Sequence, residues 1–268
     1  MMEFLGLDQG FLQRALLAVV LLAPLCALVG VPVVNLRLAY LTDAIGHTAL
    51  AGVAVGLLVG IDPRWSTLAL SLVLAGGILA VARRSRLSTD TVIGILAATV
   101  VAFGLALLSR ERGLAREAQR FLVGDVLTVD GLDLALLGGA AALAVGILGW
   151  RWNRLLALAF DLDLAEVHGR ARRLDRWLLA LVLAVATALI VRAVGVLLAT
   201  ALVVIPAATA RTWSSRAATQ PWIALVTALV AGAVGLLLSA QPSVATASGP
   251  TIVLVAAALF GVATLRRP

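Results

Sequence analysis

The chain contains no lysine: all 21 basic residues among its 268 are arginine. A Walker A loop needs a lysine on the terminal phosphates, and Schiff-base chemistry needs a lysine amine. The chain therefore carries neither a standard ATPase site nor a pyridoxal cofactor of its own. Its single cysteine, Cys26, excludes an internal disulfide and a cysteine-cluster metal site.

Charged and aromatic residues are also scarce, at 13% and 5%, whereas 62% of the residues are hydrophobic. Soluble domains are about half apolar and about a quarter charged, so the composition excludes an ordinary globular enzyme. One membrane-spanning helix takes about 20 apolar residues, and the length therefore accommodates roughly eight to ten spans. We predict an all-α, polytopic membrane helical bundle.

The apolar runs predict nine spans. They lie near residues 11–34, 44–60, 66–82, 91–109, 132–150, 177–191, 194–210, 221–239 and 250–265. Residues 1–10 carry Glu3 and Asp8 but no base, which argues against a cleaved signal peptide and for retention of the first span.

The net charge of +7 does not indicate a nucleic-acid-binding face, because the arginines cluster between apolar runs as in cytoplasmic loops. Alternate loops hold most of them, which places the N-terminus outside and the C-terminus in the cytoplasm. The loops in question contain Arg37, Arg83, Arg84, Arg86, Arg151 to Arg176, Arg211, Arg216, Arg266 and Arg267. The charge-balanced segment 110–130 is the exception, and it lies outside or forms an in-plane or re-entrant segment.

Residues 151–176 form the longest arginine-rich stretch between predicted spans. Its second half begins with acidic residues (Asp161, Asp163 and Glu166) and ends with arginines (Arg170, Arg172 and Arg173). The helix dipole favours this order of charges, so the pattern predicts one or two short cytoplasmic helices. Such a segment either docks a partner or is a solvated connector, and the pattern alone leaves both open. His168 within it is interpreted as a surface residue.

One ionisable pair falls inside a predicted span. Asp43 and His47 are four residues apart and share one face of a helix about one turn apart. A carboxylate oxygen and an imidazole nitrogen suit Zn²⁺ or Mn²⁺, and a homodimer would bring four such ligands together. In the alternative interpretation, Thr42 or Asp43 caps the helix at the membrane surface and His47 is merely interfacial.

Glycine and proline interrupt several of the predicted spans. Gly46, Gly52 and Gly56 lie in the second, Gly195 opens the seventh, and Pro206 is near its end. Breaks of this kind are tolerated where backbone lines a path buried in protein, so they suggest a translocation route. Glycine is also simply common in membrane helices, and that interpretation is favoured for any single position.

Five fragments in order make the chain resemble the permease subunit of zinc/manganese/iron ABC importers over nearly its whole length. Asp43–Ala54 is similar to the family motif Gly-Asp-x-x-Ser-His-x-x-x-Pro-Gly, with Thr42, Gly46 and Ala51 replacing its Gly, Ser and Pro. Leu162 replaces a loop proline of the family, and these departures leave the substrate open. The other fragments are Phe121–Leu127, Phe160–Gly169, Val194–Ala210 and Ser248–Leu254.

The resemblance implies a type II ABC importer-like fold with residues 1–268 as a single transmembrane permease domain in a bacterial plasma membrane. It implies a homodimer that works with a separate ABC ATPase and an extracellular metal-binding protein. It also implies that no cofactor is bound permanently and that Zn²⁺ or Mn²⁺ is the transported cargo. Within 151–176, the implied ATPase-docking residues are Phe160, Asp161, Asp163, Glu166 and Gly169. The implied helix-break or gating residues are Gly52, Gly195, Pro206, Gly249 and Pro250.

Two other classes compete with this interpretation. In a proton-coupled secondary cation transporter, Asp43 and His47 would relay protons, but the internal repeats and extra intramembrane carboxylates of such proteins are not evident. In an intramembrane protease, His47 would belong to an HExxH, Ser/His or paired-Asp arrangement, whereas it is followed by Thr-Ala-Leu. We therefore predict a transport subunit that catalyses no covalent chemistry.

Overall fold

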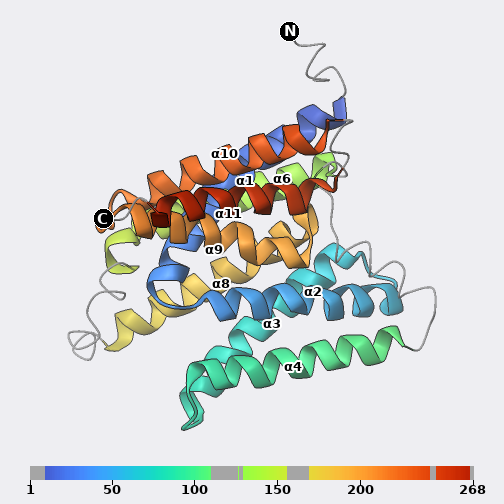
Figure 1. Cartoon of the computed structure of the whole chain (residues 1–268). Helices are drawn as coiled ribbons and strands as arrows, with labels where there is room; N and C mark the ends of the chain where they lie inside the picture. The colour runs from blue at the N-terminus through green and yellow to red at the C-terminus, as the bar shows by residue number, and fades with distance from the viewer. Residues whose placement is uncertain (1–9, 110–125, 127–128, 156–168, 242–245, 266–268) are drawn as a thin grey trace. The chain divides into compact units, whose positions relative to one another are not determined.

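The computed structural model describes residues 10–109, 126, 129–155, 169–241 and 246–265. Within these ranges there is no β-strand, and nine long helices account for most of the chain (Figure 1). They are α1 (Gly10–Asn35), α2 (Ala39–Val59), α3 (Pro63–Arg84), α4 (Thr89–Leu108), α6 (Gly131–Trp150), α8 (Gly169–Val194), α9 (Val196–Trp213), α10 (Gln220–Ser239) and α11 (Ser248–Leu265). The predicted all-α class is confirmed.

Eight of the predicted spans correspond to helices that are long and apolar enough to cross a membrane. The ninth, α9, has a shorter apolar stretch, Leu198–Trp213. Predicted and observed ends agree most poorly at α8, which begins at Gly169 rather than near residue 177. Residues 169–176 therefore belong to the first turns of a long helix and do not form a separate short one.

Local capping explains where several helices begin. The Asp62 carboxylate accepts a hydrogen bond from a first-turn backbone N–H of α3, at 2.8 Å, and Pro63 provides a first residue that needs no hydrogen-bond donor. The Ser88 hydroxyl accepts from a backbone N–H of α4 at 3.2 Å. Asp130 and Asp133 form a reciprocal capping box at the start of α6. These polar residues set the helix starts close to the predicted ones.

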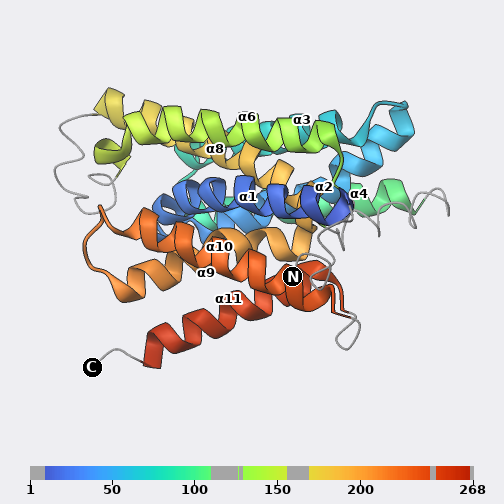
Figure 2. The same ribbon diagram turned by 90° about the horizontal axis from the view of Figure 1, so that it is seen from above.

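The chain folds into two compact units. Unit 1 comprises residues 1–36, 125–156 and 201–268, and unit 2 comprises residues 37–124 and 157–200. Unit 1 contains α1, α6, α10, α11 and most of α9, and unit 2 contains α2, α3, α4 and α8. In each unit, helices distant in sequence lie together, as α1 and α10 do in Figure 2.

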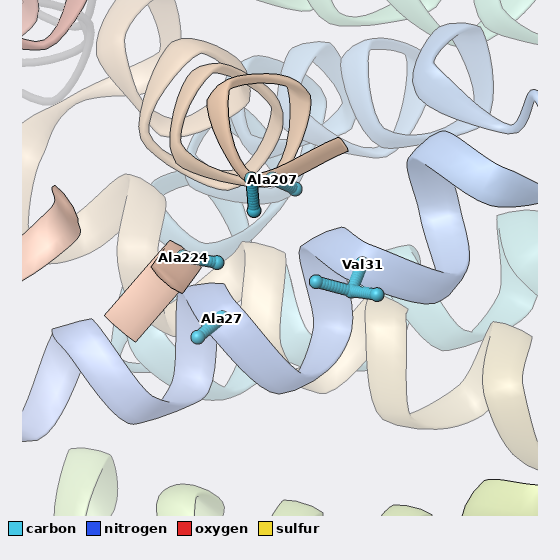
Figure 3. Packing of buried hydrophobic residues seen from close by; sticks show 5 residues of the cluster. Ala27, Val31, Ala207 and Ala224 are labelled. Carbon is cyan, nitrogen blue, oxygen red and sulfur yellow. The ribbon is translucent and has the colours of Figure 1, made fainter. Parts of the chain in front are cut away.

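Small side chains form the core of unit 1 where α1, α9 and α10 meet. Ala27, Val31, Ala207 and Ala224 are at most 2% exposed and point toward one another (Figure 3). The methyl that Gly235 lacks would lie 2.5 Å from the Cα of Ile252, so α10 and α11 also approach closely. Lipid chains are as apolar as leucine, so close packing of small residues is what holds such helices together.

A polar cluster closes one end of unit 1. The Asn35 amide donates to the buried Gln220 side chain at 2.8 Å, and Gln220 donates to the Ser214 carbonyl at 3.0 Å. Arg211 donates to the Val34 carbonyl at 3.0 Å, near the end of α1. The last four carbonyls of a helix have no partner within it, and this arginine satisfies one of them.

Helix α2 lies at the centre of unit 2, in contact with α3, α4 and α8. Two close approaches fix it: a Cβ on Gly52 would meet Thr67 of α3, and a Cβ on Gly104 of α4 would meet Ala51. The buried hydroxyls of Thr48 and Ser71 are 3.2 Å apart across the α2–α3 contact. This packing holds α2 on several sides.

Candidate metal site

Asp43 and His47 lie inside α2 and not at its end. The helix begins at Ala39, with Leu38 at the N-cap position and no side-chain cap. Thr42 and Asp43 are therefore within the first turns of the helix proper, and the alternative that either one caps it is wrong. The helix extends further toward the N-terminus than the apolar run because Tyr40 and Leu41 continue the helical backbone before the first polar side chain.

The two side chains meet as their spacing predicts. His47 Nε2 and Asp43 Oδ2 are 3.6 Å apart, one helical turn along the same face. Two metal–ligand bonds of about 2.1 Å would span that separation at an angle of about 120°, within reach of a zinc or manganese site. No third His, Cys, Asp or Glu joins them within the described part of the chain, so this pair alone supplies two protein ligands.

The pair occupies the accessible stripe of the buried middle of α2. From Leu41 to Ala54, every residue of α2 is buried except Asp43, His47 and Leu50. The Asp43 side chain is 44% exposed and the His47 side chain 37%. Because α2 is packed on its other faces over this stretch, both polar side chains lie on the same accessible side of the helix.

Helix α8 and the first residues of α9, up to Thr200, belong to unit 2 and lie against α2 at Gly46. A methyl group on Gly46 would be 3.7 Å from Thr200 Oγ1 of α9, and 3.9 Å from side-chain carbons of Thr187 and Val191 of α8. The Thr200 hydroxyl also donates to Asp43 Oδ1 at 3.2 Å. Thr200 is a residue that sequence reasoning missed, because no local pattern links it to a carboxylate 157 positions away.

The predicted helix-break residues differ in what they do to the backbone. Gly195 has a φ of 88° and separates α8 from α9, and its left-handed backbone suits glycine. Gly52, by contrast, does not interrupt α2, and neither does Gly46 or Gly56. The prediction of a break there is wrong because α2 is continuous through all three positions. Gly52 instead serves close packing, since a methyl on it would lie 2.5 Å from Thr67 Cα.

The prolines among these residues lie within helices. Pro206 is inside α9, which continues on both sides of it, and Gly249 and Pro250 are in the first turn of α11. Proline fits a first turn because the N–H it lacks has no partner there. A gating role for any of these residues stays a prediction.

Half of the predicted docking segment, residues 156–168, is outside the described residues, and this half holds four of the five predicted docking residues. Phe160, Asp161, Asp163 and Glu166 lie there, as does His168. Gly169 is the first residue of α8. The docking role of the segment therefore stays a prediction from sequence.

Comparison with known proteins gives a consistent picture. The sequence profile of the ABC 3 transport family matches residues 8–267. The chain is 31% identical over 253 residues to the high-affinity zinc uptake system membrane protein ZnuB of Haemophilus influenzae, covering 94% of this chain and 96% of that one. It is 30% identical over 262 residues to the manganese transport system membrane protein MntC of Halalkalibacterium halodurans, covering 98% and 89%.

A solved structure extends the likeness to three dimensions. PsaBC from Streptococcus pneumoniae, in complex with Fab, superposes with a TM-score of 0.85 at 25% identity. The match covers 100% of this chain and 97% of that one.

Proposed function

The chain belongs to the ABC 3 transport family, and we propose from this membership that it is the permease subunit of an ATP-driven importer of divalent metal ions. Zinc is the first candidate cargo and manganese the second. The relatives at about 30% identity are named for zinc uptake or manganese transport, so the chain's likeness to them does not separate the two metals. The helical bundle fits a multi-pass protein of a bacterial inner membrane.

The observation that carries the proposal is the Asp43–His47 pair on the accessible stripe of α2. Ionisable side chains in a membrane-spanning helix are costly to bury and mark ion pathways. One oxygen and one nitrogen ligand bind a divalent ion weakly, as transport requires, because a conducting site must also release what it binds. In a homodimer, two such pairs would provide four ligands.

In this proposal, other protein chains supply the energy for transport and deliver the metal ion. With no lysine for a Walker A loop, the chain takes its energy from a separate ABC ATPase at the cytoplasmic face. Residues 151–176 form the docking segment, and an extracellular solute-binding protein hands over the ion. ATP binding and hydrolysis then drive alternating access, with the N-terminus outside and the C-terminus in the cytoplasm.

A proton-coupled secondary transporter is the second candidate, and family membership does not favour it. Reconstitution separates the two. The chain is placed in proteoliposomes with its ATPase and binding protein, and uptake of radioactive Zn²⁺ and Mn²⁺ is followed with each component left out in turn. We expect uptake only with all three proteins and ATP. Uptake by the chain alone, driven by a proton gradient, would establish the secondary transporter instead.

A further inference from the structure

The two oxygens of the Asp43 carboxylate have different neighbours. Oδ2 faces His47 Nε2 at 3.6 Å, whereas Oδ1 accepts the Thr200 hydroxyl at 3.2 Å. A hydrogen bond to one oxygen restricts rotation of the carboxylate about its last bond and keeps the other oxygen turned toward the imidazole. The orientation of the pair thus depends on a residue of another helix.

The Thr200 hydroxyl lies close to the start of α9. Gly195, with its φ of 88°, ends α8, and Thr200 is the fifth residue of α9. The Thr200 side chain also faces Gly46 of α2: a methyl group on Gly46 would lie 3.7 Å from Thr200 Oγ1. Threonine is branched at Cβ and has few rotamers, which limits the positions that its hydroxyl can take.

We infer that Thr200 is a positioning residue that makes Asp43 a one-oxygen ligand and thereby biases the site toward zinc over manganese. The inference rests on the proposed function. With Oδ1 engaged by the hydroxyl, Asp43 offers Oδ2 alone, which suits the low coordination number of zinc. Without the hydroxyl, both oxygens are free for the ion, and additional oxygen ligands suit manganese.

The test compares three variants in the complete importer. Thr200→Val removes the hydroxyl and keeps the shape, and Thr200→Ser keeps the hydroxyl. Thr187→Val is the matched control, since the Thr187 methyl group is close to Gly46 and its buried hydroxyl has no hydrogen-bond partner among the described residues. Initial uptake rates are measured in proteoliposomes over a range of Zn²⁺ and of Mn²⁺ concentrations.

We expect Thr200→Val to raise the half-saturating Zn²⁺ concentration about 10-fold, the usual cost of losing a partner that orients a metal ligand. The half-saturating Mn²⁺ concentration should change less, so the preference for zinc falls. Thr200→Ser should restore the wild-type preference, and Thr187→Val should match wild type. If Thr200→Val does not assemble with the ATPase, Thr200→Ala replaces it.

Two results would overturn the inference while leaving the importer intact. One is an unchanged ratio of half-saturating concentrations in Thr200→Val, and the other is an equal loss for both metals that Thr200→Ser does not rescue. An Asp43→Ala variant measured in parallel tests whether Asp43 binds the transported ion at all. If it transports both metals like wild type, Asp43 binds no cargo and the proposed site itself fails.

Discussion

A methyl group on Gly52 of α2 would lie 2.5 Å from the Cα of Thr67 on α3, so the two helices touch backbone to backbone. No rotamer change can relieve such a contact, because the atom in the way belongs to the main chain. The glycine that we predicted to break the helix instead fixes the distance between α2 and α3.

Gly52→Ala should therefore push α2 and α3 apart and destabilise the protein by about 1–3 kcal/mol, the usual cost of overpacking. The thermal unfolding midpoint of the purified, detergent-solubilised complex measures the effect. Gly77→Ala is the matched control, since a Cβ on that α3 glycine meets nothing within 4 Å. Equal midpoints for the two variants would contradict the close contact.

The left-handed backbone at Gly195 gives a second prediction. Gly195→Ala should cost about 1–2 kcal/mol of strain, shift the start of α9 and weaken the Thr200–Asp43 bond, lowering metal uptake. Gly60→Ala is the control, because Gly60 has a φ of 74° with nothing within 4 Å of its Cβ position. The Gly60→Ala variant should have a similar backbone strain and a wild-type rate of metal uptake. Equal transport defects in both variants would mean that strain alone is responsible.

The polar cluster at the end of unit 1 gives a stability prediction. Gln220→Leu would leave the Asn35 amide and the Ser214 carbonyl without the partners they have now. Asn35 and Ser214 are half-buried, so the loss of each hydrogen bond should cost about 0.5–1.5 kcal/mol and the thermal unfolding midpoint should fall. Gln241→Leu, at an exposed position after α10, should leave it unchanged. A Gln220→Leu variant as stable as wild type would show that the cluster contributes little.

Charge reversal tests whether the proposed docking segment binds the ATPase. Reversing Asp161 and Glu166 to arginine should weaken co-purification of the ATPase, because the segment then presents the opposite charge to its partner. Asp90→Arg, an exposed acid at the start of α4, is the control and should leave the complex intact. A complex that survives the double reversal would identify the segment as a connector.

The sequence predicted most of the helices, because long apolar runs and local caps such as Ser88 are properties of neighbouring residues. It also predicted the Asp43–His47 pair, since a spacing of four residues places two side chains on one helical face. It did not predict the role of Gly52, because the sequence around a glycine that interrupts a helix does not differ from that around a glycine that allows close helix packing. The Asp43–Thr200 bond joins residues 157 positions apart, and no local pattern reports such a contact.

The most direct test of the account is metal uptake by the Asp43→Ala/His47→Ala double variant, in proteoliposomes with the ATPase and the binding protein. If the pair is the transient metal site, ATP-dependent uptake of Zn²⁺ and Mn²⁺ should fall to the level of vesicles without the permease. Membrane insertion and ATPase association should persist, and Asp90→Asn, at an exposed carboxylate, should transport like wild type. Uptake at the wild-type rate by the double variant would contradict the account.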